Sequence, residues 1–453
     1  MKKFFTFIAF VASTLFANGQ TNPVITAWLQ NTTGVLGRHY VPGNYTPIND
    51  VDSANVKTVY YSATWSYIRA NGVPTYITGP FLDGNPSHTT SQDAIFRFPI
   101  TPAPNTGVPT ATSGGNIGIF INGVALFDYR DGASWKSSTS TMAGGPFGGM
   151  GDGVWNRDAV VGERLGFDCA KGHPANGNYH HHQNPSAFKL DLNVISTVCN
   201  LYDADGLYVI DSTQHSPLIG FAYDGYPIYG AYAYENVNGT GNIVRMKSSY
   251  ALRNITTRTT YADGSSVTAG PAVSATYPLG YFREDYEYIP TSPSTPDYLD
   301  EHNGRFCITP EYPSGTYAYF ATVNSGWNSA YPYLIGPTYY GVKSASKVTS
   351  IPSGVTQYVS VPTNVDANTQ LPASISVFPN PSNEFIAVQS DGLGTTDLEV
   401  SLYDLTGKLV KTETIYAGST IAYFDIRTLY SGIYLIRVSN GKNEFTRQIS
   451  ILK

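Results

Sequence analysis

The sequence is poor in charge and has no cluster of basic residues. Only 13% of its 453 residues are Asp, Glu, Lys or Arg, about half of the share that is usual in soluble domains. The formal net charge is −6. Because neutralising a phosphate backbone requires clustered Lys and Arg, this composition argues against nucleic acid as a partner. Beyond the N-terminus no run is long and apolar enough to span a bilayer, so we expect no transmembrane segment in the mature chain.

The sequence also lacks the short motifs of several large enzyme classes. It contains no Gly-x-Ser-x-Gly nucleophile elbow, no His-Glu-x-x-His zinc motif and no glycine-rich phosphate loop. Glu284, Asp285, Asp300 and Glu301 form an acidic group before His302. Paired carboxylates can act as acid and base in glycoside hydrolysis, although a charged loop has the same composition. Catalytic residues therefore stay unassigned, and a secreted enzyme acting on extracellular polymer is an alternative hypothesis.

Tyrosine, glycine and proline are abundant, with 35, 44 and 29 copies. Tyrosine fits pleated, half-buried surfaces, while glycine and proline interrupt strands at turns. No long window shows the 3.6-residue period of an amphipathic helix. We therefore predict an all-β, mainly antiparallel protein with many loops.

The sequence contains only three cysteines, Cys169, Cys199 and Cys307. An exported chain can form disulfides, so one pair and one leftover thiol are expected, and the sequence does not determine which. Our interpretation is a pair between Cys169 and Cys199, because this bond would close a loop around a histidine-rich segment. A free cysteine near histidines would instead be a candidate metal ligand.

The first residues have the order of a secretory signal peptide. Two lysines precede the apolar run FFTFIAFVA at residues 4–12, and the small residues Ala17 and Gly19 precede a cleavage site before Gln20. The run is too short for a membrane anchor. We therefore expect residues 1–19 to be removed and the protein to act outside the cytoplasm.

Residues 375–453 form a separate unit. Short alternating apolar and polar stretches between Gly and Asn turns predict a small immunoglobulin-like β-sandwich. The runs VFPNP at 377–381, YDLTG at 403–407 and LYSGIY at 429–434 closely resemble the type A sorting domain of type IX secretion. This resemblance implies recognition by the type IX secretion machinery and export through the periplasm and outer membrane to the cell surface or medium. An ordinary accessory sandwich domain is the alternative.

Two further segments complete the predicted organisation. Residues 342–374 are rich in Ser, Thr, Val and Pro and are predicted to be a linker. Residues 20–341 contain no internal repeat, and we treat them as one large β-rich domain.

Histidines concentrate in one part of this domain, where five of the eight fall between His173 and His215. Successive side chains alternate between the two faces of a strand, so His180 and His182 should point together and His181 away from them. Two imidazoles on one face can chelate a metal, and imidazole suits copper or zinc. Aromatic packing in a Tyr-rich loop is the competing interpretation.

Other ligand candidates lie elsewhere in the sequence. His173 precedes His180 across a Pro, Asn and Gly loop that can fold it back as a third ligand. His215 and His302 are further candidates from distant sequence. The predicted metal site therefore contains His173, His180 and His182, with His215 and His302 as additional ligands. Carboxylates that can bind the metal or orient an imidazole are Glu163, Asp168 and Glu301.

The same region resembles the YHYH-domain proteins, a family named for a Tyr-His-Tyr-His motif. Here the motif reads YHHH at residues 179–182, and His181 stands where the motif has its second Tyr. The resemblance covers most of residues 55–341 and supports the domain assignment, but it implies no established activity. A metal-free surface adhesion or glycan-binding module is therefore another alternative function. Further matching runs are GNIGIFINGV at 115–124, HSPLIG at 215–220, DGYPIYG at 224–230 and HNGRF at 302–306.

Overall fold

The computed structural model divides the chain into two compact units, residues 1–360 and 361–453, and each is described by itself. The expected signal peptide, Cys199 and residues 360–374 of the expected linker lie outside the described residues. The structure describes residues 20–32, 34–84, 87–185, 212–291, 294–359, 375–390, 397–404, 408–440 and 444–453.

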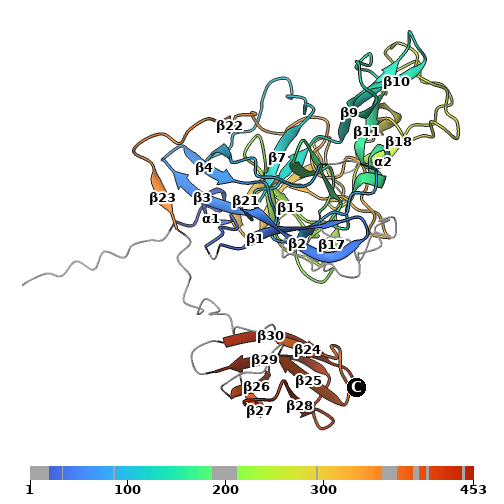
Figure 1. Cartoon of the computed structure of the whole chain (residues 1–453). Coiled ribbons are helices and arrows are strands. Elements are labelled where there is room, and N and C mark those ends of the chain that lie inside the picture. The colour runs from blue at the N-terminus through green and yellow to red at the C-terminus, as the bar shows by residue number, and fades with distance from the viewer. Residues whose placement is uncertain are drawn as a thin grey trace, which may run out of the picture. The chain divides into compact units, whose positions relative to one another are not determined.

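The first unit consists of β-sheets and, in its described part, only short helices (Figure 1). Its largest sheet has eight strands in the order β12-β13-β8-β7-β14-β15-β21-β20. Most neighbours are antiparallel, but β13 is parallel to β8, and β15 is parallel to β21. The prediction of an all-β, mainly antiparallel fold is confirmed. The strands are β7 (Asn116–Phe120), β8 (Ala125–Phe127), β12 (Gly172–Ala175), β13 (Asn178–His181), β14 (Leu218–Ala222), β15 (Pro227–Tyr229), β20 (Gly304–Thr309) and β21 (Tyr312–Phe320).

A second sheet has five strands in the order β22-β6-β4-β3-β23. Its two outer strands come from the segment that the sequence predicts to be a linker, and they pair antiparallel with β6 and β3. Residues 346–358 are thus part of the first unit. The strands are β3 (Val56–Tyr61), β4 (Trp65–Ala70), β6 (Ala94–Pro99), β22 (Ser346–Val348) and β23 (Thr356–Tyr358).

Smaller sheets and short helices surround these two sheets. Helix α2 matters for the site, because Asp158 caps its N-terminus by accepting from the amides of Val160 and Val161. The elements are α1 (Pro23–Thr26), β1 (Leu36–Val41), β2 (Asn44–Ser53), β5 (Ile77–Thr78), β9 (Arg130–Lys136), β10 (Thr141–Gly144), β11 (Asn156–Asp158), α2 (Ala159–Gly162), β16 (Tyr232–Tyr234), β17 (Ile243–Arg245), β18 (Tyr250–Leu252) and β19 (Tyr286–Tyr288), with short 3-10 turns at Gly145–Phe147, Arg164–Gly166 and Arg283–Asp285.

Many tyrosines lie in the core of the first unit and donate to buried carboxylates. Tyr179 donates to Asp168 at 2.8 Å, and Tyr319 donates to Asp224 at 2.6 Å. Burial raises the pKa of Asp168 to about 7 and that of Asp224 to about 6. Because a buried polar group without a partner is costly, each hydroxyl–carboxylate pair lets both side chains lie inside the protein.

Arg258 and Asp285 form a fully buried ion pair. Their side chains are 0% exposed, and the Arg258 Nε lies 2.7 Å from the Asp285 Oδ1. Asp285 also accepts from the amides of Gly280 and Phe282. The pair therefore joins the loop that carries Arg258 to the 3-10 turn that carries Asp285.

We expect Asp285→Ala to lower the free energy of unfolding by about 3–5 kcal/mol, because it leaves a buried guanidinium without its counter-charge. All five tryptophans lie in the first unit, so urea unfolding followed by tryptophan fluorescence reports on it. The control is Asp93→Ala, since the Arg69–Asp93 side chains are 45% and 49% exposed and such pairs contribute about 0–1 kcal/mol. Equal losses in the two variants would contradict the prediction.

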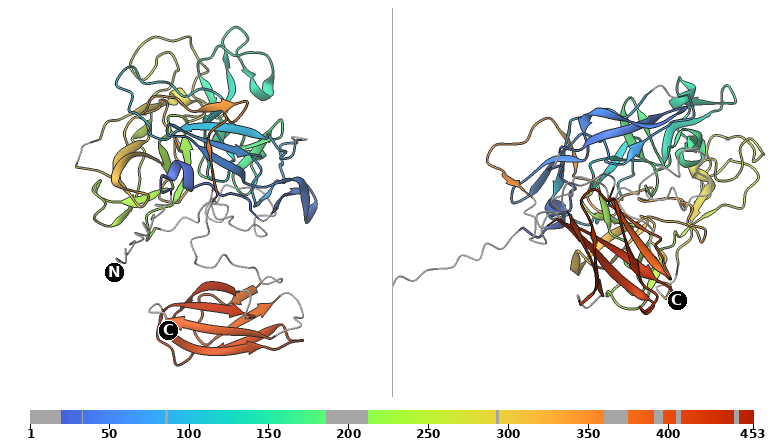
Figure 2. Two further views of the ribbon diagram at one scale, coloured as in Figure 1. Left: turned by 90° about the vertical axis from the view of Figure 1, so that its left-hand side faces the viewer. Right: turned by 60° about the horizontal axis from the view of Figure 1, so that its bottom comes forward.

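The second unit is a β-sandwich of a three-stranded and a four-stranded sheet (Figure 2). Alternating residues of β26, among them Leu398, Val400 and Leu402, point into a core of its own. The predicted small immunoglobulin-like sandwich is confirmed. Its strands are β24 (Ile375–Phe378), β25 (Phe385–Ser390), β26 (Leu398–Asp404), β27 (Leu409–Ile415), β28 (Ile421–Asp425), β29 (Gly432–Ser439) and β30 (Glu444–Ile451).

Two of the three cysteines are described. Cys307 on β20 is a buried free thiol, and burial raises its pKa. Cys169 is disulfide-bonded. Because Cys199 lies outside the described residues, the expected Cys169–Cys199 pair stays a prediction.

Among the described residues, no helix is long and apolar enough to cross a membrane.

Candidate metal centre

The histidine-rich segment is a β-hairpin at the edge of the eight-stranded sheet. Strands β12 and β13 pair antiparallel, and His173 lies directly opposite His180. The turn between them is formed by Asn176 and Gly177, with φ values of 51° and 79°. Two positive φ values in an Asn-Gly pair are typical of the tight turn that connects twisted strands. This turn brings His173 back beside the second strand.

The structure brings His173, His180 and His182 together. One nitrogen of each ring lies within 4.8 Å of a nitrogen of the other two. All three side chains are buried, and the Nε2 atoms of His180 and His182 are 3.1 Å apart. His182 follows directly after β13, so the two rings point to the same side of the hairpin, as strand alternation predicts.

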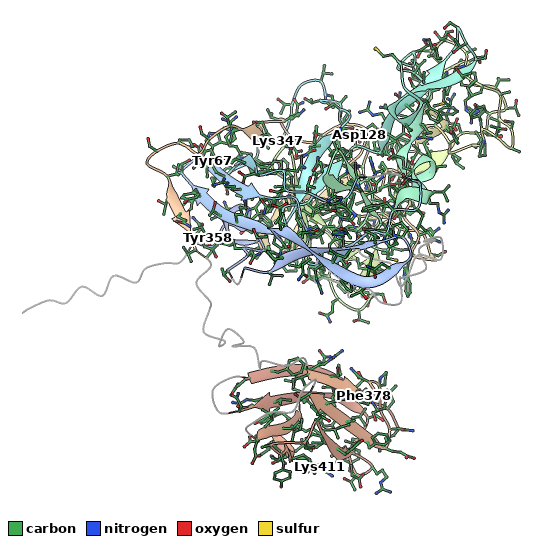
Figure 3. All side chains as sticks on the ribbon, viewed as in Figure 1. Tyr67, Asp128, Lys347, Tyr358, Phe378 and Lys411 are labelled. Carbon is green, nitrogen blue, oxygen red and sulfur yellow. The ribbon has the colours of Figure 1, made fainter. Side chains whose placement is uncertain are left out.

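The other ring nitrogens of two of these residues are held by the backbone. His180 Nδ1 lies 2.9 Å from the carbonyl oxygen of Asn178, and His182 Nδ1 lies 2.5 Å from that of Asp128, which is labelled in Figure 3. A carbonyl only accepts, so each Nδ1 carries the proton and donates it. In the neutral rings both Nε2 atoms therefore present lone pairs. Such a bond fixes the tautomer and orientation of a metal-binding imidazole.

Glu163 adds a carboxylate oxygen to the three histidines. It follows α2 directly, and its Oε2 lies 3.3 Å from the Nε2 atoms of both His173 and His182. Burial raises the pKa of Glu163, but hydrogen bonds with the two histidines outweigh it and hold the pKa well below its usual range. Burial alone would lower the pKa of His182, but the hydrogen bond and negative charge of Glu163 outweigh burial and raise this pKa above 6.5. The pKa of His180 lies well below 6.5, because burial and the two neighbouring imidazoles disfavour its protonated form.

Aromatic rings enclose the cluster. Phe127 stacks on His180 with ring centroids 3.8 Å apart, and Phe167 lies edge-on to His173 at 4.9 Å. These contacts fix the imidazole planes and keep the cluster away from bulk water. We name His173, His180, His182 and Glu163 the histidine cluster.

His181 points to the other side of the hairpin. Its Nε2 lies 2.6 Å from the hydroxyl of Tyr76, and its ring packs edge-on against Phe120 and Tyr179. Burial lowers the pKa of His181 to about 3. Its surroundings are those of a neutral core histidine.

The other two predicted ligands, His215 and His302, are not part of the cluster among the described residues. His215 Nδ1 donates to the carbonyl of Ser216 at 2.7 Å, and its ring packs against Tyr229 and Tyr234. The structure therefore does not support these two residues as ligands, because the local hairpin assembles the cluster without the distant segments that carry them. His302 Nδ1 bonds the hydroxyl of Thr338 at 2.8 Å.

Apart from Glu163, the acidic residues singled out in the sequence have other partners. Asp168 accepts from Tyr179 and from the amides of Gly79, Ala170 and Gly172. The carboxylates of the other four also have partners within the first unit: Glu284 bonds Asn156, Asp285 pairs with Arg258, Asp300 accepts from Tyr317, and Glu301 lies 3.8 Å from His302.

Sequence reasoning missed the groups that orient the cluster. No sequence motif identifies these groups, which are the backbone carbonyls of Asn178 and Asp128 and the aromatic rings of Phe127 and Phe167. Phe127 ends β8 and Asp128 follows it directly. Because β8 pairs with β13, only the strand order brings these two residues to the histidines.

Three imidazole nitrogens and one carboxylate oxygen form a donor set that suits zinc or copper. Zinc takes four such ligands in a tetrahedral shell, and imidazole also suits copper. With Glu163 as the fourth donor the coordination shell is closed, and without it one position is open.

Comparison with known proteins gives two family matches. The model of the secretion system C-terminal sorting domain matches residues 376–452, and the YHYH protein model matches residues 95–331, more than half of the chain. With the sandwich fold, the first match defines an exported protein, a type IX secretion substrate that reaches the medium or the cell surface through the outer membrane. The chain belongs to the YHYH protein family. Both resemblances noted in the sequence are confirmed.

Two solved structures that are similar to this chain each match a part of it. A DUF3244 family protein with an immunoglobulin-like β-sandwich fold from Bacteroides vulgatus is 15% identical, with 17% of this chain and 81% of that chain covered and a TM-score of 0.15. Dimeric latent PorU from Porphyromonas gingivalis is 18% identical, with 24% of this chain and 11% of that chain covered and a TM-score of 0.16. No curated protein matches the chain. No activity follows from similarities as limited as these.

Proposed function

We propose that this exported protein binds one transition-metal ion, copper or zinc, in the histidine cluster. The ligands are the Nε2 atoms of His173, His180 and His182, with Glu163 as the fourth donor. One observation carries this proposal. The Nε2 atoms of His180 and His182 lie 3.1 Å apart, while the Nδ1 proton of each ring is donated to a backbone carbonyl.

Two neutral imidazoles in this orientation cannot hydrogen-bond to each other, because neither Nε2 carries a proton. Burying two facing lone pairs without a partner is unfavourable. A cation between them satisfies both atoms. A proton on His182, held by Glu163, is the competing occupant, and a metal ion additionally uses the Nε2 of His173, which lies 3.3 Å from the same Glu163 oxygen.

The test is the metal content of the mature full-length chain after incubation with zinc or copper and dialysis against a weak chelator. We expect about one equivalent of one of these metals per chain. Copper(II) would also give an electron paramagnetic resonance spectrum with nitrogen coupling. A correctly folded chain that retains neither metal would show that the cluster is held by a proton, and the proposal would fail.

A further inference from the structure

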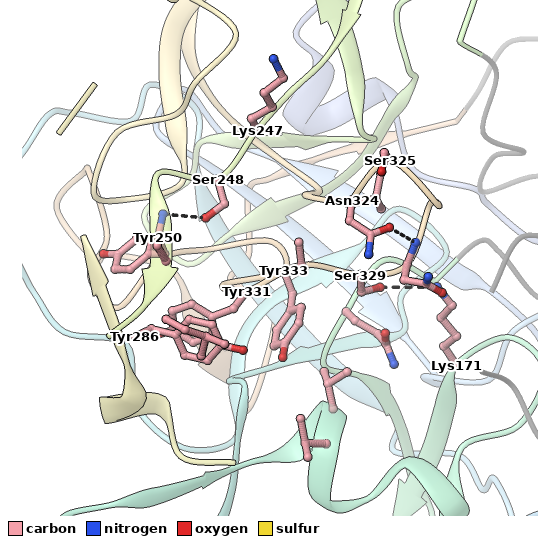
Figure 4. Close-up of a pocket in the computed structure, with 18 of the residues that line it drawn as sticks. Lys171, Lys247, Ser248, Tyr250, Tyr286, Asn324, Ser325, Ser329, Tyr331 and Tyr333 are labelled. Atoms are coloured by element: carbon pink, nitrogen blue, oxygen red, sulfur yellow. Dashed lines mark hydrogen bonds between the residues drawn. The ribbon is translucent and has the colours of Figure 1, made fainter. Parts of the chain in front are cut away.

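A cleft of about 760 Å³ opens in the first unit next to the histidine cluster. Its volume lies within the range of about 300–1,000 Å³ that is typical of small-molecule sites. The cleft lies between α2, β17, β18 and the segment 323–333. In Figure 4 the side chains of Tyr250, Tyr286 and Tyr331 gather on one side, and Lys171 and Asn324 lie on the other.

Four basic residues line this cleft, namely Arg164, Lys171, Arg245 and Lys247, and of these Lys171 is buried with its Nζ 3.4 Å from the hydroxyl of Ser329. Arg245 donates to the carbonyl of Val323 at 2.5 Å and, in the part of the chain that the structure describes, pairs with no carboxylate. A carbonyl carries no net charge, so the positive charge of Arg245 is not neutralised. Lys247 forms an ion pair with Asp297, which is not among the residues that line the cleft.

The described lining of the cleft contains more basic than acidic residues. Asp168 is the acidic residue among its described lining residues, and its side chain is fully buried. Tyr179 and three backbone amides already bind its carboxylate oxygens. The lining therefore favours an anionic ligand, even though the whole chain has a net charge of −6.

The remaining lining residues suit a ligand with hydroxyl groups. Ser248, Ser325 and Ser329 line the cleft together with Asn324. The side-chain oxygen of Asn324 accepts from the amides of Gly326 and Asn328, which leaves its NH₂ group as a donor. Tyrosine rings combine apolar faces with polar hydroxyls, so they can pack against the C–H faces of a sugar ring.

The cleft is adjacent to the histidine cluster but separate from it. Phe167 lines the cleft and lies edge-on to His173, so this residue borders both sites. Gln183 and Arg164 line the cleft and directly follow His182 and Glu163 in the chain. None of the three cluster histidines lines it. A ligand in the cleft therefore needs no metal for binding.

We propose that this cleft binds an acidic saccharide, with its carboxylate or sulfate groups on Arg245 and Lys247 and its ring hydroxyls on the serines and Asn324. Exported proteins meet such polymers outside the cell. Charge-assisted hydrogen bonds from Arg245 hold the acidic group in place, and the rings of Tyr250 and Tyr286 pack on the face of the sugar. This site is distinct from the proposed metal function.

The test is calorimetric titration of the mature chain, stripped of metal, with trigalacturonate. The matched control ligand is its fully methyl-esterified form, which keeps the sugar and removes the charge. We expect the acidic form to bind at least about tenfold more tightly, with affinity falling as salt is raised from about 0.05 to 0.5 M. Tripolyphosphate, which carries charge but no sugar, should bind at least about tenfold more weakly than trigalacturonate.

Two variants locate the site. Arg245→Gln and Lys247→Gln should each weaken trigalacturonate binding by about tenfold. Lys343→Gln removes an equal charge from an exposed position outside the cleft and should have no effect. Circular dichroism checks that each variant is folded.

Several outcomes would overturn the proposal. Equal binding of the methyl ester would show that charge is not recognised, and equal binding of tripolyphosphate would show a simple anion site. No binding of trigalacturonate, or unchanged affinity in both cleft variants, would also reject it. Because the titration uses metal-free protein, none of these outcomes bears on the histidine cluster.

Discussion

His180→Ala and His182→Ala should each abolish retention of zinc or copper under conditions where the parent chain keeps about one equivalent. Each substitution removes one of three imidazole donors from a buried site that has no other histidine within reach. Losing even a group that only orients a ligand costs about 10–100-fold in affinity, so losing a ligand should cost more. The measurement is metal content after dialysis, with folding checked by circular dichroism.

Two further variants make this experiment specific. His302→Gln removes a buried histidine that bonds Thr338 outside the cluster, so the metal should be retained. Glu163→Gln keeps a donor oxygen but removes the charge, so we expect a smaller loss of affinity than on removing an imidazole ligand, about 10–100-fold. If His302→Gln lost the metal while either alanine variant kept it, the ligand assignment would be wrong.

Deleting residues 375–453 should stop the protein from reaching the medium or cell surface and leave it in the periplasm. The deleted residues contain the matched sorting domain, and their core is separate from that of the first unit. The first unit therefore keeps its own buried residues and should stay folded. Immunoblotting of periplasmic and extracellular fractions measures the distribution.

The complementary control attaches residues 361–453 to a periplasmic reporter protein. This unit is compact by itself, so we expect it to direct the reporter out of the cell. Wild-type levels of the truncated chain in the medium would contradict the sorting role. A truncated chain that is degraded in the periplasm would still agree with the expected block, provided that none appears outside.

The local part of the candidate site could be predicted from the sequence, but its long-range part could not. Strand alternation predicts that His180 and His182 point together, and the Asn-Gly turn returns His173 to them. The exclusion of His215 and His302 depends on which strands become neighbours in the sheet. That order is set by packing across the whole unit, which no short segment encodes.

The high tyrosine content predicted strands but not what the tyrosines do inside the protein. A strand propensity describes a residue that fits a pleated, half-buried surface. The structure shows tyrosines such as Tyr179 and Tyr319 fully buried, each with its hydroxyl on a buried carboxylate. Such pairs join residues as far apart as Asp224 and Tyr319, and the sequence between them gives no sign of the contact.

The hairpin of β12 and β13 lies at one end of the strand order in the large sheet. An outermost strand has neighbours on one side only, and such edges open most readily in local fluctuations. His173 belongs to the outermost strand, whereas His180 and His182 belong to the next strand and its end. A metal ion bound by all three histidines would link the outermost strand to its neighbour. Metal binding would therefore slow local opening of this edge of the sheet as well as occupy the site.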